Sequence, residues 1–224
     1  MRLIAGMDEA GRGPVIGPIV FGLVIVNENQ EKILRTLGVN DSKQLSEPKR
    51  ESLKEIIVKN SEFSRTHAIS ANEINDYMSN GTNLNQIEII GFTALLEQIS
   101  QKIDELQLDA ADVNAARFGS NFEHLVSGKI DSRHKGDSIF ISVAAASIIA
   151  KTERDDQVKN LQKRMIRVDP NLPSFGSGYP TDATPFLKEF YAKYRTFPTI
   201  ARTHWKTCKK IKEKFDQAQL DDYF

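Results

Sequence analysis

The residues best suited to chemistry stand near the start of the chain, in the stretch GMDEAGRGPVIGP at positions 6–18. Two adjacent acids, Asp8 and Glu9, end a short apolar run, although acids are depleted from the interiors of strands. Gly-Arg-Gly follows at once, and glycine lets a backbone turn sharply or approach another molecule closely. The pattern predicts a strand that ends in a negatively charged site, with one cation and bare backbone beside it.

Two further acids stand in similar settings. Asp109 ends the apolar segment LQLD, and Asp137 follows His-Lys-Gly and precedes a run of small residues. Four carboxylates meeting at strand ends would supply hard oxygen ligands, which suit Mg²⁺ or Mn²⁺ better than zinc. Two such ions could activate a water and stabilise the leaving oxygen in phosphodiester hydrolysis. Taken alone, each acid is better explained as a cap or turn residue, and sequence spacing does not bring the four together.

The composition is that of an ordinary globular protein. The chain has 224 residues, of which 40% are hydrophobic and 27% charged, enough for one large domain with or without a small appendage. The longest apolar stretch, at 15–26, is too short to span a membrane, and the acids near the start argue against a signal peptide. A single cysteine, Cys208, excludes an internal disulfide and a cysteine zinc cluster. We expect a cytoplasmic protein with no membrane partner.

The charge is unevenly distributed along the chain. The net charge is zero, yet residues 131–215 hold 17 Lys and Arg against 9 Asp and Glu, while the residues before them are acidic. An acidic half joined to a basic half could place a metal site beside a phosphate-binding face. Charge runs are usually solvated surface, so this feature alone is weak support for nucleic-acid binding.

Hydrophobic patterns predict the elements that must position these residues. Branched apolar runs predict four strands, and apolar residues at helical spacing predict six helices. Asn83 is suited to cap the most regular of the helices. The expected strands are 2–8, 18–26, about 62–69 and 106–109; the expected helices are 28–37, 48–59, 83–103, 142–163, 184–194 and about 203–215. Together they predict an α/β or α+β sheet flanked by helices.

The motifs occur in an order that resembles type 2 ribonuclease H, the ribonuclease HII family. The segments that carry the resemblance are MDEAGRGPVIGP, VNDSKQLS, LDAAD, HKGD with SVAAASIIAKTERD, and GSGYPTD. The resemblance implies an RNase H-like mixed β-sheet flanked by helices, with a small C-terminal helical region. It also implies a catalytic domain at 1–168, a C-terminal loop and helical region at 169–215, and a flexible tail at 216–224.

The resemblance also implies which acids bind the metals. Carried over by motif position, the catalytic and metal-binding residues are Asp8, Glu9, Asp109 and Asp137, with two Mg²⁺ or Mn²⁺ ions during catalysis. The motif does not select Asp112 or Asp131, which remain the nearest rivals. Many relatives have alanine before the last aspartate, where this chain has glycine; the change removes no ligand.

Substrate recognition is implied by three further motifs of the family. The glycine loop of Gly11, Arg12 and Gly13 would read the 2′-hydroxyl that distinguishes RNA from DNA. Tyr179 would stack on the sugar that follows the ribonucleotide, which favours a junction of RNA with DNA. A hydroxyl and a cation suited to a backbone phosphate come from Asp41, Ser42 and Lys43. The implied enzyme cuts the RNA strand of RNA/DNA hybrids and single ribonucleotides in duplex DNA, on the 5′ side of the ribonucleotide.

The end of the chain fits the peptide pattern of proteins that bind the sliding clamp, PCNA. That pattern has a glutamine, an aliphatic residue and two aromatics, matched by Gln217, Leu220, Tyr223 and Phe224. A single turn from Leu220 would place its apolar members on one side as a plug for a clamp pocket. The tail predicts an archaeal-type enzyme that binds PCNA. We also expect the protein to be a monomer. The lysines at 206–214 could follow a duplex backbone or form a solvated face, and both readings stay open.

Two other functions remain. A metal-dependent phosphohydrolase of a small substrate would use the same acids, but the chain has no Walker-type nucleotide loop and its basic half would be unused. A non-catalytic module that binds nucleic acid or the clamp would leave the four acids without a role. Divalent-metal-dependent cleavage of a duplex with one embedded ribonucleotide separates the three.

Overall fold

The computed structural model describes residues 1–40 and 45–221, apart from the side chains of residues 218–221. The described chain forms five strands, β1(Leu3–Ala10), β2(Ile19–Asn27), β3(Phe63–Ile69), β4(Glu105–Asp109) and β5(Lys129–Arg133). Its helices are α1(Glu28–Thr36), α2(Glu47–Lys59), α3(Ala71–Ser79), α4(Leu84–Leu96), α5(Ala115–Ser120), α6(Gly136–Ile139), α7(Ile141–Val168), α8(Pro180–Tyr194) and α9(Lys206–Asp221).

The chain folds into two compact units, and each is discontinuous in sequence. Unit 1 comprises Met1–Ala10, Val20–Ala68 and Asn83–Arg154, and unit 2 comprises Gly11–Ile19, Ile69–Thr82 and Asp155–Phe224. Helix α7 contributes its first half to unit 1 and its second half to unit 2. The predicted functional divisions at 168/169 and 215/216 stay predictions.

Unit 1 is built on one mixed sheet in the order β3-β2-β1-β4-β5. Strand β1 pairs antiparallel with β2 and parallel with β4, which in turn pairs parallel with β5. Because β1 and β4 run the same way with Met7 opposite Leu108, the next residues, Asp8 and Asp109, reach the same edge of the sheet. The predicted mixed sheet flanked by helices is confirmed.

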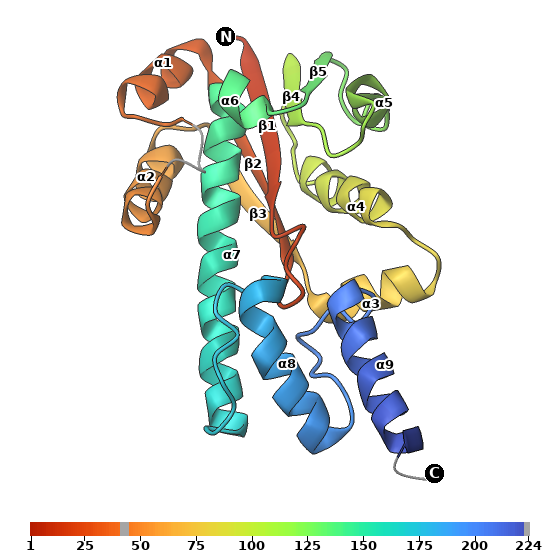
Figure 1. Cartoon of the computed structure of the whole chain (residues 1–224). Coiled ribbons are helices and arrows are strands. Elements are labelled where there is room, and N and C mark those ends of the chain that lie inside the picture. Colours follow the sequence, from red (N-terminus) through yellow and green to blue (C-terminus); the bar gives the residue numbers. More distant parts are fainter. Residues whose placement is uncertain (41–44, 222–224) are drawn as a thin grey trace. The chain divides into compact units, whose positions relative to one another are not determined.

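Helix α7 approaches one face of the sheet very closely (Figure 1). A Cβ atom on Gly6 of β1 would lie 2.1 Å from the backbone of Ser142, and one on Gly22 of β2 would lie 2.3 Å from the carbonyl of Ala146. The prediction that the small residues of this helix permit a close backbone approach is therefore confirmed. The same face is completed by apolar residues of α1 and α2, among them Leu34 and Leu53.

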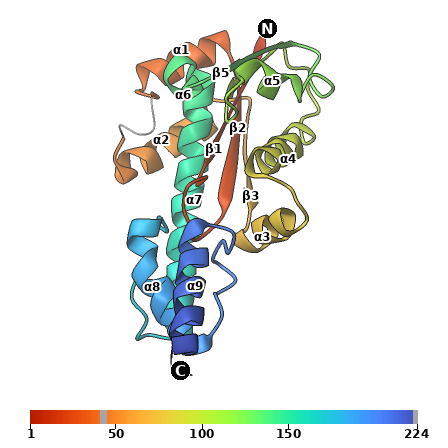
Figure 2. The same cartoon turned by 45° about the vertical axis from the view of Figure 1, so that its right-hand side comes forward.

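Helices α4 and α5 cover the opposite face of the sheet (Figure 2). A Cβ on Gly91 of α4 would lie 2.2 Å from the ring of Phe21 on β2, so this helix also packs with almost no space. The rings of Phe21, Phe92, Phe118 and Phe122 contact one another edge-on. Phe21 faces α4 and the next residue, Gly22, faces α7. Successive residues of β2 therefore point in turn to the two helical layers.

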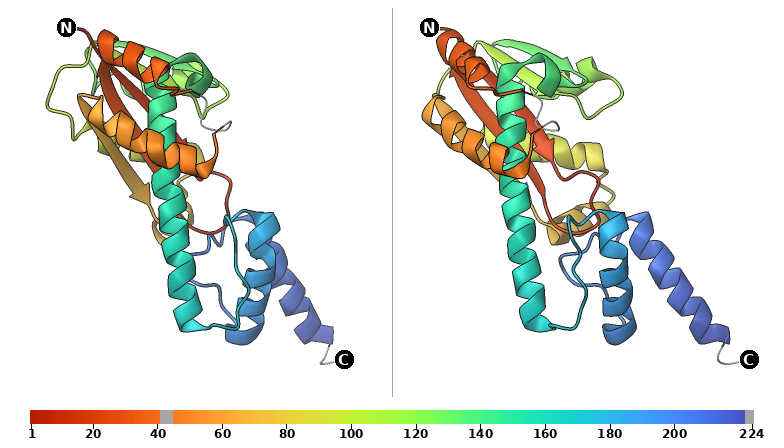
Figure 3. Two further views of the ribbon diagram at one scale, coloured as in Figure 1. Left: turned by 90° about the vertical axis from the view of Figure 1, so that its left-hand side faces the viewer. Right: turned by 60° about the vertical axis from the view of Figure 1, so that its left-hand side comes forward.

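Unit 2 has its own apolar core. Within it, α8 lies between the second half of α7 and helix α9, as Figures 1 and 3 both show. Val15 and Ile16 of the segment after the glycine loop are fully buried there against residues of α7 and α8, including Val158 and Phe186. The Gly-Arg-Gly loop is therefore followed directly by a segment that is anchored by its buried apolar side chains.

Several predicted helix limits were wrong. Helix α4 ends at Leu96, seven residues earlier than predicted, because Ile103 is buried in the approach to β4 instead. Helix α9 continues to Asp221, since residues 216–221 contain good helix formers and neither glycine nor proline. Leu220 therefore belongs to a long helix and does not begin a separate turn. In the ranges that the structure describes, no helix has both the length and the apolar character of a membrane span.

Candidate functional site

Asp8, near the end of β1, has its side chain in the layer between the sheet and α7. It is only 4% exposed, and its carboxylate accepts a hydrogen bond at 2.8 Å from the backbone N–H of Glu9. Burial and the nearby carboxylates of Asp109 and Asp137 raise the pKa of Asp8 to about 8, although hydrogen bonds from Ser147 of α7 and from the backbone oppose the shift. Three of the four predicted acids therefore share one electrostatic site within unit 1.

A strained turn and a glycine bring Asp137 to this site. Lys135 adopts the left-handed conformation with φ 58°, which costs a non-glycine residue roughly 1 kcal/mol. Gly136 then packs directly on the end of β4: its N–H donates to Asp109 Oδ1 at 3.0 Å, and a Cβ would lie 2.8 Å from the carbonyl of Leu108. Glycine at this position, where the sequence departs from the family motif, suits the tight approach of α6 to β4.

Glu9 has a different position from the other three acids. By alternation along β1 it leaves the strand on the side opposite Asp8, and its strand partner is Phe21, which faces α4. In the described part of the chain, no three His, Cys, Asp or Glu side chains are already spaced to hold a metal. The acids are gathered at one edge of the sheet without forming a closed ligand set.

The two rival acids have structural partners. Asp131 on β5 accepts hydrogen bonds from Arg133 at 2.7 Å and from Lys129 at 3.2 Å, and these lower its pKa. Asp112 accepts from the Arg117 side chain at 2.7 Å and from the backbone N–H of Asn114 at 3.0 Å, which lowers its pKa as well. Both carboxylates have hydrogen-bond partners in a turn or an edge strand, which is the structural role expected of an isolated acid.

The glycine loop lies in unit 2 against the loop that carries Tyr179. Gly11 has φ 94°, a left-handed conformation that only glycine adopts without strain. A Cβ on Gly13 would lie 3.2 Å from a ring carbon of Tyr179, so the bare glycine leaves room for the ring. The carbonyl of Gly178 accepts from the backbone N–H groups of Val15 at 2.9 Å and Ile16 at 3.1 Å. The two predicted recognition motifs are thus brought together, and Tyr179 stays 46% exposed.

Two residues that the sequence did not reveal hold the glycine loop by its carbonyl groups. Arg202 is fully buried and donates to the carbonyls of Gly17 at 2.9 Å and Arg12 at 3.1 Å. Trp205 donates through Nε1 to the carbonyl of Gly13 at 3.1 Å, and its ring stacks on the Arg202 guanidinium. The contacts join positions about 190 residues apart, so no local pattern could have indicated them.

Comparison with known proteins identifies the family of this chain. Residues 5–208 match the family model described as Ribonuclease HII. A ribonuclease HII of Methanocaldococcus jannaschii is 38% identical, over 97% of this chain and 98% of its own length. The chain belongs to the ribonuclease HII family. It is accordingly an enzyme, and its relatives support an endonuclease activity of the ribonuclease H type.

Two solved structures of ribonuclease HII proteins are similar over nearly the whole chain. The ribonuclease H2 of Pyrococcus horikoshii superposes with a TM-score of 0.86 at 35% identity, covering 96% of this chain and 99% of its own. A ribonuclease HII from Archaeoglobus fulgidus, solved in a complex with PCNA, has a TM-score of 0.80 at 33% identity, covering 91% and 95%. The RNase H-like fold of the family is thereby shown for this chain.

Some residues of the predicted substrate-binding and clamp-binding motifs lie outside the described part of the chain. They are Asp41, Ser42 and Lys43, and at the end of the chain Tyr223 and Phe224. Gln217 is exposed on α9, and Leu220 belongs to the same helix, with its side chain outside the description. The monomeric state and the cytoplasmic location stay predictions.

Proposed function

We propose that the chain cuts the RNA strand of RNA/DNA hybrids and duplex DNA that contains a single ribonucleotide, on the 5′ side of the ribonucleotide. The observation that carries the proposal is the buried carboxyl of Asp8 beside Asp109 and Asp137, at the edge where two parallel strands end. A pKa strongly perturbed by burial and by like charges is typical of a functional site. Membership of the ribonuclease HII family supports the reaction class.

Divalent cations are the expected partners of these acids. Asp8, Glu9, Asp109 and Asp137 would hold two Mg²⁺ or Mn²⁺ ions, because carboxylate oxygens are the ligands that both ions prefer. When bound, such ions supply an activated water and neutralise charge on the leaving oxygen. The protein's own contribution is to bury the carboxylates of Asp8 and Asp137 and to orient Asp109 through the Gly136 N–H.

The charges around Asp8 fit a cation. Two of the groups that shift its pKa are like-charged aspartates, Asp109 and Asp137, which produces a repulsion between carboxylates. A divalent ion would relieve it. Because the described acids are not spaced as a closed ligand set, binding would draw the side chains toward the ion, and Glu9 would approach from the other side of β1.

Recognition of the ribonucleotide is assigned to unit 2. Gly11 and Gly13 would offer backbone groups to the 2′-hydroxyl with no side chain in between, and Arg12 adds a cation. The ring of Tyr179, exposed and seated on Gly13, would contact the next sugar. A backbone phosphate would be bound by the Asp41-Ser42-Lys43 motif, as the family resemblance implies.

The decisive experiment uses a labelled duplex with one embedded ribonucleotide. With Mg²⁺ or Mn²⁺ we expect one cut on its 5′ side, leaving 3′-hydroxyl and 5′-phosphate ends. The same duplex made entirely of DNA is the matched control and should stay intact. Equal cutting of the two duplexes, or full activity in a chelator, would overturn the proposal; hydrolysis of only a small phosphomonoester would favour the phosphohydrolase alternative.

Replacing Tyr179 with alanine should slow cleavage at a single embedded ribonucleotide by roughly 10-fold or more, since stacking on one ring is worth about 1–3 kcal/mol. The loss should be smaller on a continuous RNA/DNA hybrid, which presents many ribonucleotides to the glycine loop. Tyr179→Phe keeps the ring and should retain most of the activity. Single-turnover rates on the two substrates measure the difference, and equal rates for Tyr179→Ala and the parent would remove this residue from the site.

Clamp binding is proposed for the end of the chain. The support is the pattern of Gln217, Leu220, Tyr223 and Phe224, together with the related Archaeoglobus fulgidus protein solved in a complex with PCNA. Because α9 continues to Asp221, truncation at 216 would shorten a helix, and substitution of the two aromatics is the cleaner test.

The variant Tyr223→Ala with Phe224→Ala should lose at least about 10-fold in affinity for the cognate clamp, since the aromatic anchors of an interface carry most of its energy. The parent is expected to bind with micromolar affinity because a short peptide must become ordered on binding. Gln219→Ala, between the pattern positions, is the control and should bind like the parent. Calorimetry measures all three, and undiminished binding by the double variant would contradict the assignment.

A further inference from the structure

The turn between β5 and α6 contains a lysine in a conformation that lysine rarely adopts. Lys135 has φ 58° and ψ 40°, and among the described residues Arg195 is the one other non-glycine residue with a positive φ. Such a conformation costs folding free energy and persists where the surrounding structure holds it, often at a functional site. Lys135 also stands at the cap position before α6, although its side chain has no hydrogen-bond acceptor with which to cap a helix. Neither its backbone nor its cap position therefore explains a lysine.

Contacts on both sides fix this turn to the end of β4 and the loop that follows it. Before the lysine, the ring of His134 contacts the carbonyl of Val113 through Nε2 at 3.2 Å. After the lysine, the N–H of Gly136 donates to Asp109 Oδ1 at 3.0 Å. Both neighbours of Lys135 are therefore held by the segment that carries Asp109, and the position of the lysine backbone beside this carboxylate is set.

Lys135 is exposed next to buried acids. Asp137, two residues later, is only 2% exposed. In the ranges that the structure describes, the Lys135 ammonium forms no ion pair with a carboxylate, whereas Lys129 and Arg133 of the preceding strand both do. An ammonium bonded to Asp109 or Asp137 would compete with a metal ion for that carboxylate. A lysine held close to these acids and yet apart from them is suited to bind an anion instead.

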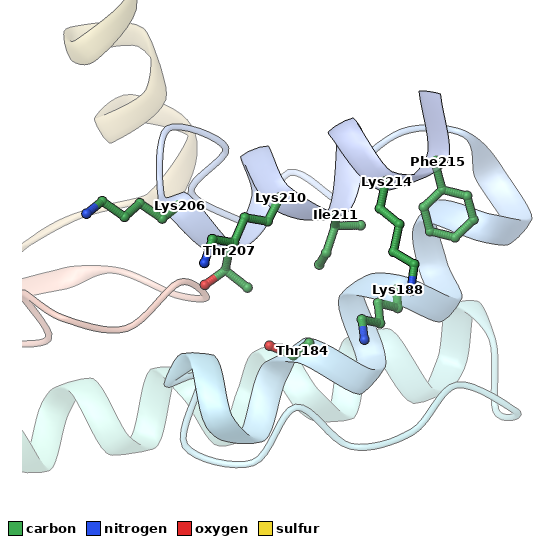
Figure 4. Close-up of a pocket in the computed structure, with 8 residues that line it drawn as sticks. All are labelled: Thr184, Lys188, Lys206, Thr207, Lys210, Ile211, Lys214 and Phe215. Atoms are coloured by element: carbon green, nitrogen blue, oxygen red, sulfur yellow. The ribbon is translucent and has the colours of Figure 1, made fainter. Parts of the chain in front are cut away.

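The lysines of unit 2 have a different setting. They lie on regular helical backbone with no positive φ, along a groove between α8 and α9 that Figure 4 shows: Lys188, Lys206, Lys210 and Lys214. Exposed lysines on a helix are common, and no strain is needed to hold them there. The strained backbone of Lys135 distinguishes it from these lysines.

The dimensions of a lysine fit a phosphate bound beside the acids. The Cα atom of Lys135 is about 3.8 Å from that of Gly136, whose N–H contacts Asp109. A lysine side chain extends about 6 Å from its Cα. A phosphate close to the carboxylates of Asp109 and Asp137 would therefore lie within reach of the ammonium, which is a strong donor to phosphate oxygens. Because the acids repel a phosphate, a cation at this place would also offset that repulsion.

We propose that the Lys135 ammonium binds a non-bridging oxygen of the phosphate that is cut, and that the strained turn keeps this ammonium away from Asp109 and Asp137. The inference rests on the proposed function and adds to it a direct contact with the reacting group. The ammonium stabilises negative charge that develops on the phosphate, so its loss should lower kcat more than it raises KM. It transfers no proton and binds no metal.

The first test separates the effect of the ammonium from that of the strained backbone. Lys135→Gly removes the ammonium and allows the left-handed conformation without strain. Its kcat on a duplex with one ribonucleotide should fall about 10- to 100-fold, the range for a lost hydrogen bond to a charged group. Its unfolding temperature in a chelator should stay the same or rise by up to about 4 °C. Lys135→Arg keeps a cation, and its kcat should remain within about 5-fold of the parent's.

Arg195→Gly is the control with the same change of backbone, at the residue that ends α8. It should keep the parent's kcat, because a glycine in a left-handed turn does not by itself slow the reaction. A kcat of Lys135→Gly within about 2-fold of the parent's would overturn the proposal. A fall in both kcat and unfolding temperature would also overturn it, because that is the result expected of a lysine with a structural role.

A second measurement needs no cleavage. Asp137→Asn with Mg²⁺ is mixed with the duplex that contains one ribonucleotide, and an amine-acylating reagent then labels the accessible lysines. Labelling of Lys135, measured by mass spectrometry, should fall at least about 5-fold when the duplex is present, because a phosphate-bound ammonium is shielded. Lys129, at the other end of β5, is the internal control and should be labelled equally with and without the duplex.

The labelling result also separates this inference from the proposed function. Equal labelling of Lys135 in the two samples would overturn the assignment of the lysine even if the parent cuts the duplex. Protection of Lys135 with a parent that does not cut would support the phosphate contact and count against the proposed nuclease activity.

Discussion

Asp137→Asn should lower the rate of cleavage at an embedded ribonucleotide on the order of 10³-fold, at saturating Mg²⁺. Asparagine keeps the size of the side chain and removes the charge that the proposed metal site needs. Because Asp137 adds to the repulsion on Asp8, the variant should also fold at least as stably as the parent. Single-turnover cleavage and thermal unfolding measure the two effects on the same preparation.

Asp131→Asn is the matched control, six residues earlier. Asp131 is already engaged by Arg133 and Lys129 at the edge strand, so its loss should change the rate by less than about 3-fold and lower stability slightly. Asp109→Asn should likewise lose most of the cleavage rate, whereas Asp112→Asn should keep it, because Asp112 is bound by Arg117 at the surface. Inactivation by Asp131→Asn with full activity in Asp137→Asn would reverse the assignment.

Asp8→Asn should stabilise the metal-free protein at pH 8. The folded protein raises the pKa of Asp8 from 3.8 to about 8, so ionisation opposes folding, and stability falls as the pH rises between these values. The variant cannot ionise at this position and so avoids this loss of stability. At pH 8 in a chelator its unfolding temperature should be at least about 2–4 °C higher, which corresponds to about 1 kcal/mol in a chain of this size. Near pH 4 the advantage should disappear.

Magnesium and a second aspartate provide the controls for the Asp8 prediction. Mg²⁺ should stabilise the parent more than Asp8→Asn, because the ion neutralises the carboxylates that repel one another. Hydrogen bonds from Lys193, the Asn171 N–H and Tyr194 lower the pKa of Asp169, so that carboxylate stabilises the fold above its unfolded pKa. Asp169→Asn should therefore be less stable than the parent at pH 8, a change opposite in sign to that expected for Asp8→Asn. A fall in unfolding temperature for Asp8→Asn at pH 8 would refute the prediction.

The sequence alone favoured a cap or turn role for each site acid, and only the family motifs selected Asp8, Glu9, Asp109 and Asp137, whose catalytic roles stay predictions. The electrostatic effect of Asp109 on Asp8 depends on the parallel pairing of β1 with β4, which no local pattern specifies. The close packing of α7 on the sheet was predictable from the small residues of the helix. The structure adds that Gly6 and Gly22 are the sheet residues whose missing side chains allow it.

Elements with weak hydrophobic patterns were missed. Strand β5, Lys129–Arg133, is largely polar and exists as a strand only through its pairing with β4. Helix α3 has only nine residues, and its capping box of Ser70 and Glu73 is a signal that could have found it. Helix α6 has four residues and follows the left-handed Lys135, a conformation that sequence does not predict for lysine. Contacts such as Arg202 with the Arg12 carbonyl depend on the complete fold.

The long separation between the glycine loop and its supports has a consequence for synthesis of the protein. Val15 and Ile16 are made well before Gly178, Arg202 and Trp205, which hold this segment in the folded protein. At about 5–20 residues per second, the 190 residues between Arg12 and Arg202 take about 10–40 s to translate. During that interval the apolar residues after the loop lack their native cover, so we expect the nascent chain to expose a chaperone-binding segment until Arg202 and Trp205 have been made.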